Sequence, residues 1–170
     1  MHLGRFTYKG RESIGLISGG KIVDIGDRFR ALHEVIDKTG PGWNKLALSE
    51  AGPAVRLNDV ILKPALDPDR IVFALAANYR KHAEEAGVGV PDHPVIFTKP
   101  ESACVGSGEP IVLPKISTKM DYEGELAAVV GRTARSVSAT DAVVHRWIYH
   151  RERPNCTRLT MDEPRAASHR

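Results

Sequence analysis

Cysteine and long apolar runs are both scarce in this sequence, and each shortage excludes a class of protein. Only two of the 170 residues are cysteine, which is too few for a disulfide framework or for a four-cysteine zinc site. The longest apolar run, residues 71–77, is far shorter than the roughly 20 residues that a membrane-spanning helix requires. Residues 1–7 also lack the apolar region of a signal peptide, so we expect a cytoplasmic protein.

Positive charge is in excess only at the C-terminal end. The net charge is +3, and residues 143–170 alone hold six arginines against three acidic residues, a balance of +3. Residues 1–142 are therefore neutral in sum. A neutral body argues against a phosphate-binding surface, and we predict neither a nucleic-acid partner nor a membrane partner.

The order of predicted strands, turns and helices is typical of a mixed α/β protein that is mainly β. Alternating residues broken by Lys-Gly and Gly-Gly turns, then a helical pattern after Asp27, predict a small α+β domain over residues 1–63. A proline-containing connector follows this domain. Residues 69–142 then predict several strands, one of them at 111–113, and one helix that ends at Gly87.

Glu123 and Glu125 are the first candidates for chemistry. They are two positions apart on a predicted strand, so their side chains point to the same face. Carboxylates beside an apolar strand need a cation partner, and an all-oxygen site suits Mg²⁺, Mn²⁺ or Ca²⁺ rather than zinc. The alternative is a solvated strand face that holds no ion.

His82 and Glu85 form a second candidate pair. They are three positions apart on the predicted helix, so they share a face and can hydrogen-bond. A carboxylate that orients an imidazole makes it a general base for water or for a proton next to a carbonyl group. Residues 87–91, rich in glycine and proline, have the composition of a closing lid. The alternative is an exposed pair on a surface helix.

Two further residues have a plain structural alternative. Lys99, at the end of a predicted strand, can hold a substrate carboxylate or can simply be solvated. Cys104 has no cation near it in sequence, so we interpret it as a small packed residue rather than a nucleophile.

Three motifs occur in order in the second predicted domain. Residues 78–85 read Asn-Tyr-x-x-His-x-x-Glu, residues 94–100 read Pro-Val-Ile-Phe-Thr-Lys-Pro, and residues 121–131 read Asp-Tyr-Glu-Gly-Glu followed by apolar residues and glycine. Together they resemble the fumarylacetoacetate hydrolase family. The resemblance extends over residues 1–142, because the start of the chain is similar to the small N-terminal domain of bacterial members.

The resemblance implies a fold, an activity and a partner. Residues 69–142 would form the first part of a mixed β-roll, and full-length members are usually homodimers. The implied enzyme is metal-dependent, with Mg²⁺ or Mn²⁺ as the expected ion. It acts on 2-oxo acids from aromatic catabolism by hydrolytic C–C cleavage, decarboxylation, isomerisation or hydration.

The resemblance also implies roles for single residues. Glu123 and Glu125 would be metal ligands, and His82 with Glu85 would be the water-activating dyad on a lid helix. Lys99 and Tyr79 would contact the substrate.

The chain departs from the family after residue 142. Family members continue with a segment like Gly-Tyr-Thr-x-x-Asn-Asp-x-Thr-Ala-Arg-Asp, whose last residue is the third metal ligand, and this segment is absent here. Residues 143–170 have neither strand alternation nor helical periodicity, so we expect a disordered tail.

A shifted reading frame accounts for the departure. One set of codons compatible with residues 146–158, read one base later, specifies Gly-Gly-Tyr-Thr-Ile-Ala-Asn-Asp-Leu-Thr-Ala-Arg and then Asp or Glu. We therefore expect a frameshift near codon 146 and an enzyme that is inactive as it stands, because its third carboxylate is missing. The alternatives are a natural divergent tail and a catalytically silent fragment that only associates with partners.

Overall fold

The structure is a computed structural model that divides into two compact units. The described residues are 1–40, 42, 46, 52–68, 70–116, 120–123, 125–142, 146–149 and 158–161. In the last strands, at 120–123, 146–149 and 158–161, only the backbone is described. One unit comprises residues 1–32 and 49–108, and the other comprises 33–48 and 109–170. Within the described part of the chain, no helix is long and apolar enough to cross a membrane.

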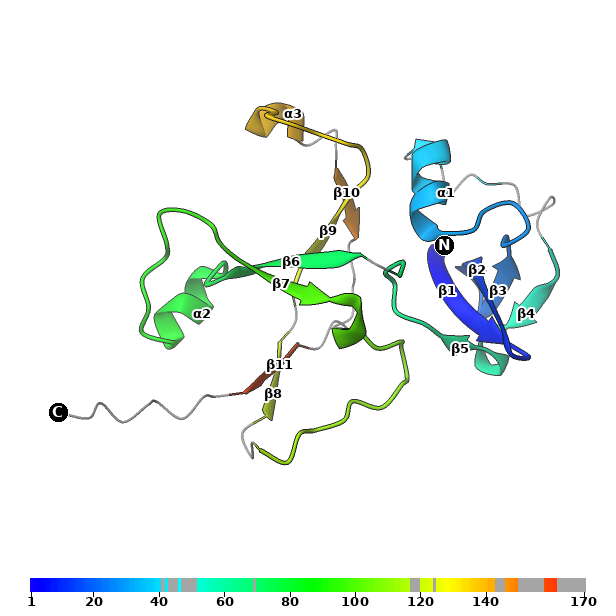
Figure 1. Cartoon of the computed structure of the whole chain (residues 1–170), viewed down its shortest axis with the longest axis horizontal. Coiled ribbons are helices and arrows are strands. Elements are labelled where there is room, and N and C mark those ends of the chain that lie inside the picture. The colour runs from blue at the N-terminus through cyan, green and yellow to red at the C-terminus, as the bar shows by residue number, and fades with distance from the viewer. Residues whose placement is uncertain are drawn as a thin grey trace. The chain divides into compact units, whose positions relative to one another are not determined.

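The first unit begins with an antiparallel sheet of five strands in the order β4-β3-β2-β1-β5 (Figure 1). The strands are β1 His2–Tyr8, β2 Arg11–Ser18, β3 Lys21–Asp24, β4 Ala54–Arg56 and β5 Ile61–Leu62. The turns after β1 and β2 have positive φ at both central residues, Lys9-Gly10 and Gly19-Gly20, as tight hairpins require. This confirms the predicted series of short strands and glycine-containing turns.

Apolar side chains of this sheet and of the segment after it form the core of the first unit. The buried members are Phe6, Ile14, Leu16, Ile22, Ile25, Phe29 and Leu32. Gly15 permits two strands to pack closely here, because a Cβ atom at this position would lie 2.6 Å from Cγ1 of Ile22. Helix α1, Leu32–Thr39, follows as predicted and ends at Gly40, which has a φ of 57°.

The connector at residues 63–68 is fixed to the first unit by three hydrogen bonds. Arg5 donates through Nη1 to the carbonyl oxygen of Leu66 at 2.5 Å, and Lys63 donates its backbone N–H to the carbonyl oxygen of Arg5 at 2.9 Å. Buried Asp67 accepts from the backbone N–H of Leu32 at 2.8 Å. The first unit therefore continues across the predicted domain boundary, through the short helix η3 Leu57–Asp59 and the connector into the next hairpin.

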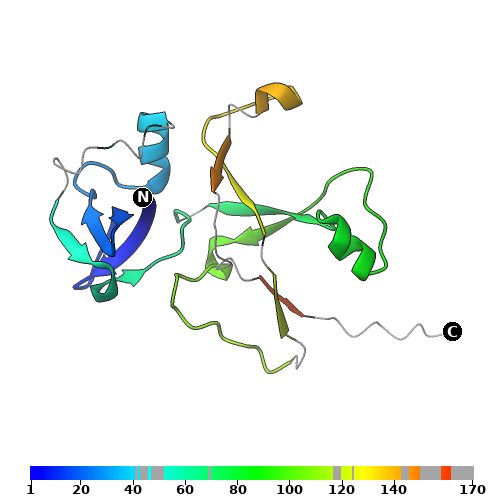
Figure 2. The same ribbon diagram turned by 180° about the vertical axis from the view of Figure 1, so that it is seen from behind.

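That hairpin pairs β6, Ile71–Ala76, with β7, Val95–Pro100, in antiparallel register (Figures 1 and 2). Between these strands the chain forms helix α2, Arg80–Glu85, and after β7 it forms the short helix η4, Glu101–Ala103. This part of the first unit carries the candidate dyad.

The second unit contains residues 33–39 of α1, two antiparallel strand pairs and a further short helix. The elements after α1 are β8 Met120–Glu123, β9 Ala127–Val130, α3 Ala139–Ala142, β10 Arg146–Tyr149 and β11 Arg158–Met161. β10 pairs with β9, and β11 pairs with β8.

The structure differs from the sequence-based expectation in two segments. Residues 111–113 form no strand and are exposed, because Pro110 and Pro114 flank them and proline lacks the N–H that a strand ladder requires. β10 and β11 lie within residues 143–170, for which a disordered tail was predicted. β10 contains Trp, Ile and Tyr, residue types enriched in strands. The rest of the predicted tail lies outside the described residues.

Candidate functional site

Helix α2 holds the candidate dyad, and its two ends are well defined. Tyr79 precedes it in an extended conformation. At the other end, Gly87 has a φ of 67°, and the backbone N–H groups of Val88 and Gly87 donate to the carbonyl oxygens of Ala83 and Glu84 at 2.9 and 3.1 Å. This pair of bonds is a Schellman motif, which needs a left-handed residue at that position and so favours glycine. The helix therefore has a fixed length of six residues.

The burial pattern of α2 gives it one packed and one exposed face. Ala83 is completely buried, whereas His82 and Glu85 are exposed. Their spacing of three places both on one side of the helix. Water and small solutes can therefore reach the imidazole and the carboxylate, as a general base requires.

The candidate substrate contacts belong to the same unit as the dyad. Lys99 lies on β7 opposite Val72 of β6 and is half-buried. Its Nζ atom is 5.8 Å from the centre of the Phe97 ring, within the range of a cation–π interaction. Tyr79 is 44% exposed and immediately precedes α2. Lys99 therefore has a defined side-chain partner, which a merely solvated lysine lacks.

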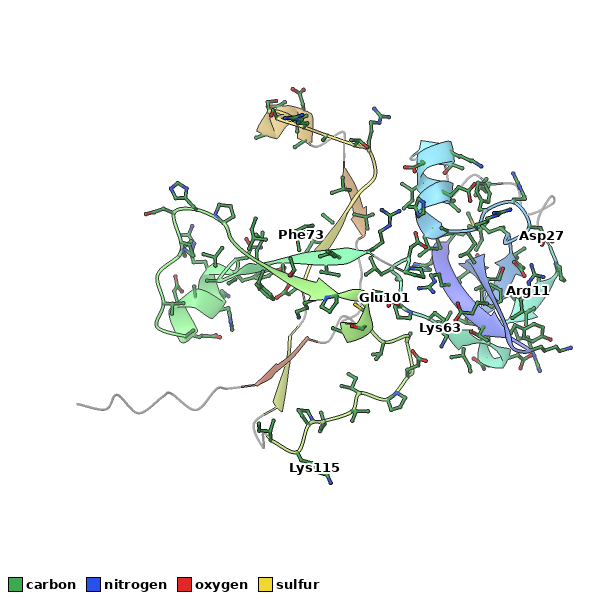
Figure 3. The ribbon with its side chains drawn as sticks, in the orientation of Figure 1. Arg11, Asp27, Lys63, Phe73, Glu101 and Lys115 are labelled. Carbon is green, nitrogen blue, oxygen red and sulfur yellow. The ribbon has the colours of Figure 1, made fainter. Side chains whose placement is uncertain are left out.

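Figure 3 shows how side chains lie around this hairpin. Phe73 projects from β6, and Glu101 lies on η4. Phe73 is 71% exposed. Glu101 Oε1 lies 4.0 Å from Nη1 of Arg5, whose side chain is only 12% exposed. Nothing in the local sequence indicates that Arg5 is buried, because an arginine on a short strand is usually solvated.

The acidic pair belongs to the second unit. Glu123 ends β8, and Glu125 follows it and is exposed. The residue directly opposite Glu123 is Arg158 of β11. Among the residues that the structure describes, no group of three His, Cys, Asp or Glu side chains comes close enough to hold a metal ion.

The residue types of this segment are those that a hard divalent cation prefers. Mg²⁺ and Mn²⁺ are bound through several oxygen ligands, and residues 121–125 carry three carboxylates, Asp121, Glu123 and Glu125, with Arg158 opposite Glu123 in the strand register. The side chains predicted to act together are thus divided between the units: Tyr79, His82, Glu85 and Lys99 in the first, Glu123 and Glu125 in the second.

One ion pair of the first unit, between Arg56 and Asp59, shifts the pKa of a titratable group. Arg56 donates to Asp59 through Nε and Nη2 at 2.8 and 3.2 Å. This hydrogen bond, with the charge of Asp59, raises the pKa of the Arg56 guanidinium. Both residues lie in the first unit, on β4 and η3, and they serve the fold rather than the candidate site.

Residues 71–149 match the family model described as fumarylacetoacetate (FAA) hydrolase, C-terminal. Over these residues the chain is similar to the fumarylacetoacetate hydrolase family. All six candidate site residues lie within the matched region. The resemblance that the three motifs indicated is thereby confirmed.

Two curated relatives and one solved structure agree with the family. Oxaloacetate tautomerase FAHD2A, mitochondrial, from Bos taurus is 40% identical over 100 residues, covering 58% of this chain and 32% of that protein. The Homo sapiens protein of the same name is 39% identical over 100 residues, with the same shares. Fumarylacetoacetate hydrolase from Exiguobacterium antarcticum superposes with a TM-score of 0.61 at 31% identity, covering 85% of this chain and 52% of that one.

These matches also settle the fold class and the extent of the chain. The mainly β, mixed α/β fold is confirmed, because the solved relative is a family enzyme that aligns with most of this chain. The chain spans about a third of the length of the curated relatives and about half of the solved one.

Proposed function

We propose that this chain carries part of the catalytic machinery of a divalent-metal-dependent enzyme that acts on 2-oxo acids. The observation that carries the proposal is the family match over residues 71–149, which contains every candidate site residue. The relatives named oxaloacetate tautomerase favour proton transfer next to the 2-oxo group as the reaction.

In the proposed reaction, His82 is the general base. Its imidazole takes a proton from the carbon next to the 2-oxo group, the C–H electron pair forms a C=C bond, and the carbonyl oxygen takes a proton from water to give the enol. The imidazolium then returns its proton to the hydroxide that is left, which restores the neutral base. Glu85 holds the imidazole in position and stabilises its charged form. The exposed side of α2 makes both groups accessible to substrate.

Lys99 and Tyr79 are the proposed substrate contacts. The lysine ammonium would bind a carboxylate of the substrate, and its contact with Phe97 restricts where that charge can lie. Tyr79 would donate its hydroxyl hydrogen to a substrate oxygen. A dicarboxylic 2-oxo acid has a carboxylate for Lys99 and a further oxygen for the Tyr79 hydroxyl.

Glu123 and Glu125 are the proposed ligands for Mg²⁺ or Mn²⁺, and Ca²⁺ has the same preference for oxygen. Because the chain lacks the family segment whose last residue is the third metal ligand, we propose that it is inactive by itself.

A second candidate function is association without catalysis. It is favoured by the exposed apolar side chains of the β6–β7 hairpin, where Ile71, Phe73 and Ile96 are 57%, 71% and 60% exposed. A face of this kind is typical of a surface that another chain covers.

A chimeric protein separates the two candidates. Residues 1–142 would be joined to the part of the Exiguobacterium antarcticum enzyme that this chain lacks, and conversion of enol to keto oxaloacetate would be followed by absorbance. We expect Mg²⁺-dependent conversion that His82→Ala removes. His2→Ala, the same change at an exposed histidine of β1, is the matched control and should have no effect. A folded chimera without Mg²⁺-dependent conversion would favour the association role.

A further inference from the structure

One face of the β6–β7 hairpin is exposed along its whole length and carries no charge. Residues directly opposite one another on paired strands lie on the same face of a sheet, so alternate residues of β6 and their partners on β7 define this face. Its members, which we call the hairpin face, are Ile71, Phe73, Leu75, Ile96, Thr98 and Pro100. All six are exposed, and Phe73, at 71% exposure, projects from β6 (Figure 3). Five of the six are apolar, and the sixth, Thr98, is uncharged.

The opposite face of the same hairpin is more covered and carries a proposed substrate contact. Of its six residues only Val95 is exposed, whereas the other five, Lys99 among them, are half-buried. On this face the Nζ atom of Lys99 lies 5.8 Å from the centre of the Phe97 ring. The hairpin face is therefore separate from Lys99, and a substitution on it leaves that candidate site residue in place.

The hairpin face needs a cover. Among the strands that the structure describes, β6 and β7 pair only with each other, and a two-stranded sheet is at best marginally stable in water. Contiguous apolar surface is typical of a surface that another polypeptide covers. Each of the two strands also has an outer edge whose backbone groups are open to a further strand. These features suit a partner that brings both apolar side chains and strands.

The comparison with the solved relative indicates which polypeptide has these properties. The Exiguobacterium antarcticum enzyme aligns with 85% of this chain, yet the chain covers only 52% of that enzyme. About half of the enzyme therefore has no counterpart here. We propose that the hairpin face binds, as a separate polypeptide, the part of a family enzyme that this chain lacks. This proposal rests on the proposed function only for the identity of the partner.

Other partners fit the hairpin face less well. Nucleic acids and anionic membranes are bound through basic side chains, and the face has none. A second copy of this chain would offer only the same face again, and it lacks the same part of the enzyme.

Co-expression tests the proposal. This chain, with an affinity tag, would be produced together with the part of the Exiguobacterium antarcticum enzyme that it lacks. The purified material would be measured by size-exclusion chromatography with light scattering, and we expect one fragment per chain. A fragment that does not co-purify with this chain would overturn the proposal. A dimer of this chain alone that Thr98→Glu dissociates would also overturn it, because the face would then bind a second copy.

A charge on the hairpin face should prevent the association. Thr98 lies opposite Phe73, and Thr98→Glu adds a charge to the face without removing an apolar side chain. The amount of fragment recovered per chain should fall at least about tenfold, because a charge that is buried without a partner is strongly unfavourable. Should circular dichroism show that Thr98→Glu does not fold, Phe73→Ser, which removes apolar surface instead, should give the same loss.

Val90→Asp is the matched control. Val90 is an apolar residue that is 58% exposed and lies between α2 and β7, outside the hairpin face. This variant should bind as much fragment as the unchanged chain does. Equal recovery with Thr98→Glu and with the unchanged chain, or an equal loss in Val90→Asp, would contradict the proposal.

The outcome is distinguishable from that of the proposed function. Association without Mg²⁺-dependent conversion of oxaloacetate would confirm the partner of the hairpin face and contradict only the proposed reaction. An active chimera whose two parts do not associate as separate polypeptides would contradict only the present inference.

Discussion

Replacing Arg5 by alanine is expected to destabilise the first unit far more than removing an exposed arginine. The Arg5 side chain is 12% exposed and donates to the carbonyl oxygen of Leu66 at 2.5 Å. It also lies 3.6 Å from Glu12 and 4.0 Å from Glu101. It is therefore the main side-chain link from β1 to the connector and to η4.

The size of the effect follows from these contacts. A hydrogen bond from a charged donor contributes about 1.5–3 kcal/mol, whereas long ion pairs to exposed carboxylates contribute less than about 1 kcal/mol. The free energy of unfolding should fall by about 2–3 kcal/mol. For a unit of this size the melting temperature should fall by roughly 10–20 °C.

Unfolding in urea, monitored by circular dichroism, measures this decrease in the free energy of unfolding. Arg11→Ala is the matched control, because Arg11 and Asp27 form a shorter ion pair of 3.0 Å that is 64% and 89% exposed (Figure 3). That variant should change stability by less than about 0.5 kcal/mol. If Arg5→Ala lowered the free energy of unfolding by no more than Arg11→Ala does, the argument that Arg5 fixes the connector would be refuted.

Three other predictions concern the connector, the dyad and the C-terminal strands. Asp67→Ala should lower the free energy of unfolding in urea by about 1–2 kcal/mol, because the N–H of Leu32 at the start of α1 loses its acceptor. A decrease no larger than that caused by Asp27→Ala would contradict this prediction. In the chimera, His82→Ala should lower kcat by roughly 10² to 10⁴ and Glu85→Gln by less, whereas full activity of His82→Ala would make the dyad a structural pair. In the natural chain, trypsin should cut beyond residue 142 before it cuts within β1 to β3, because two-stranded pairs are only marginally stable. Mass spectrometry of samples taken at successive times gives the order in which these sites are cleaved. Cleavage within the five-stranded sheet before any cleavage beyond residue 142 would refute the prediction.

Local signals accounted for the parts of the fold that were predicted well. The Lys9-Gly10 and Gly19-Gly20 turns have the positive φ values that their composition favours, and the registers of β1 with β2 and of β2 with β3 follow from these turns. Helix α2 ends at Gly87 as predicted, because the Schellman motif depends on one residue.

Features that depend on distant residues were not predicted. The pairing of β8 with β11 joins segments more than thirty residues apart, and nothing in either segment specifies the other. The bond from Arg5 to Leu66 spans 61 positions and has no local signal. The prediction of a strand at residues 111–113 was wrong, because it gave more weight to the apolar composition of this segment than to the prolines on both sides.

The candidate site was predictable as a set of residues but not as an arrangement. The three motifs identified His82, Glu85, Lys99, Glu123 and Glu125, and the family match confirms the region that contains them. Sequence reasoning found the missing third carboxylate only by comparison with the family motif. The strand register was needed to show that position 158 lies opposite Glu123.

The most direct test of the central claim is the Mg²⁺ dependence of oxaloacetate enol conversion by the chimera of residues 1–142. The rate should rise with Mg²⁺ to saturation, return to the uncatalysed rate with a chelator, and be lost in Glu123→Ala and Glu125→Ala. Asp27→Ala, which removes a carboxylate that is 89% exposed in the first unit, should leave it unchanged. Saturable conversion that persists at the same rate in the chelator, or in both glutamate variants, would contradict the account.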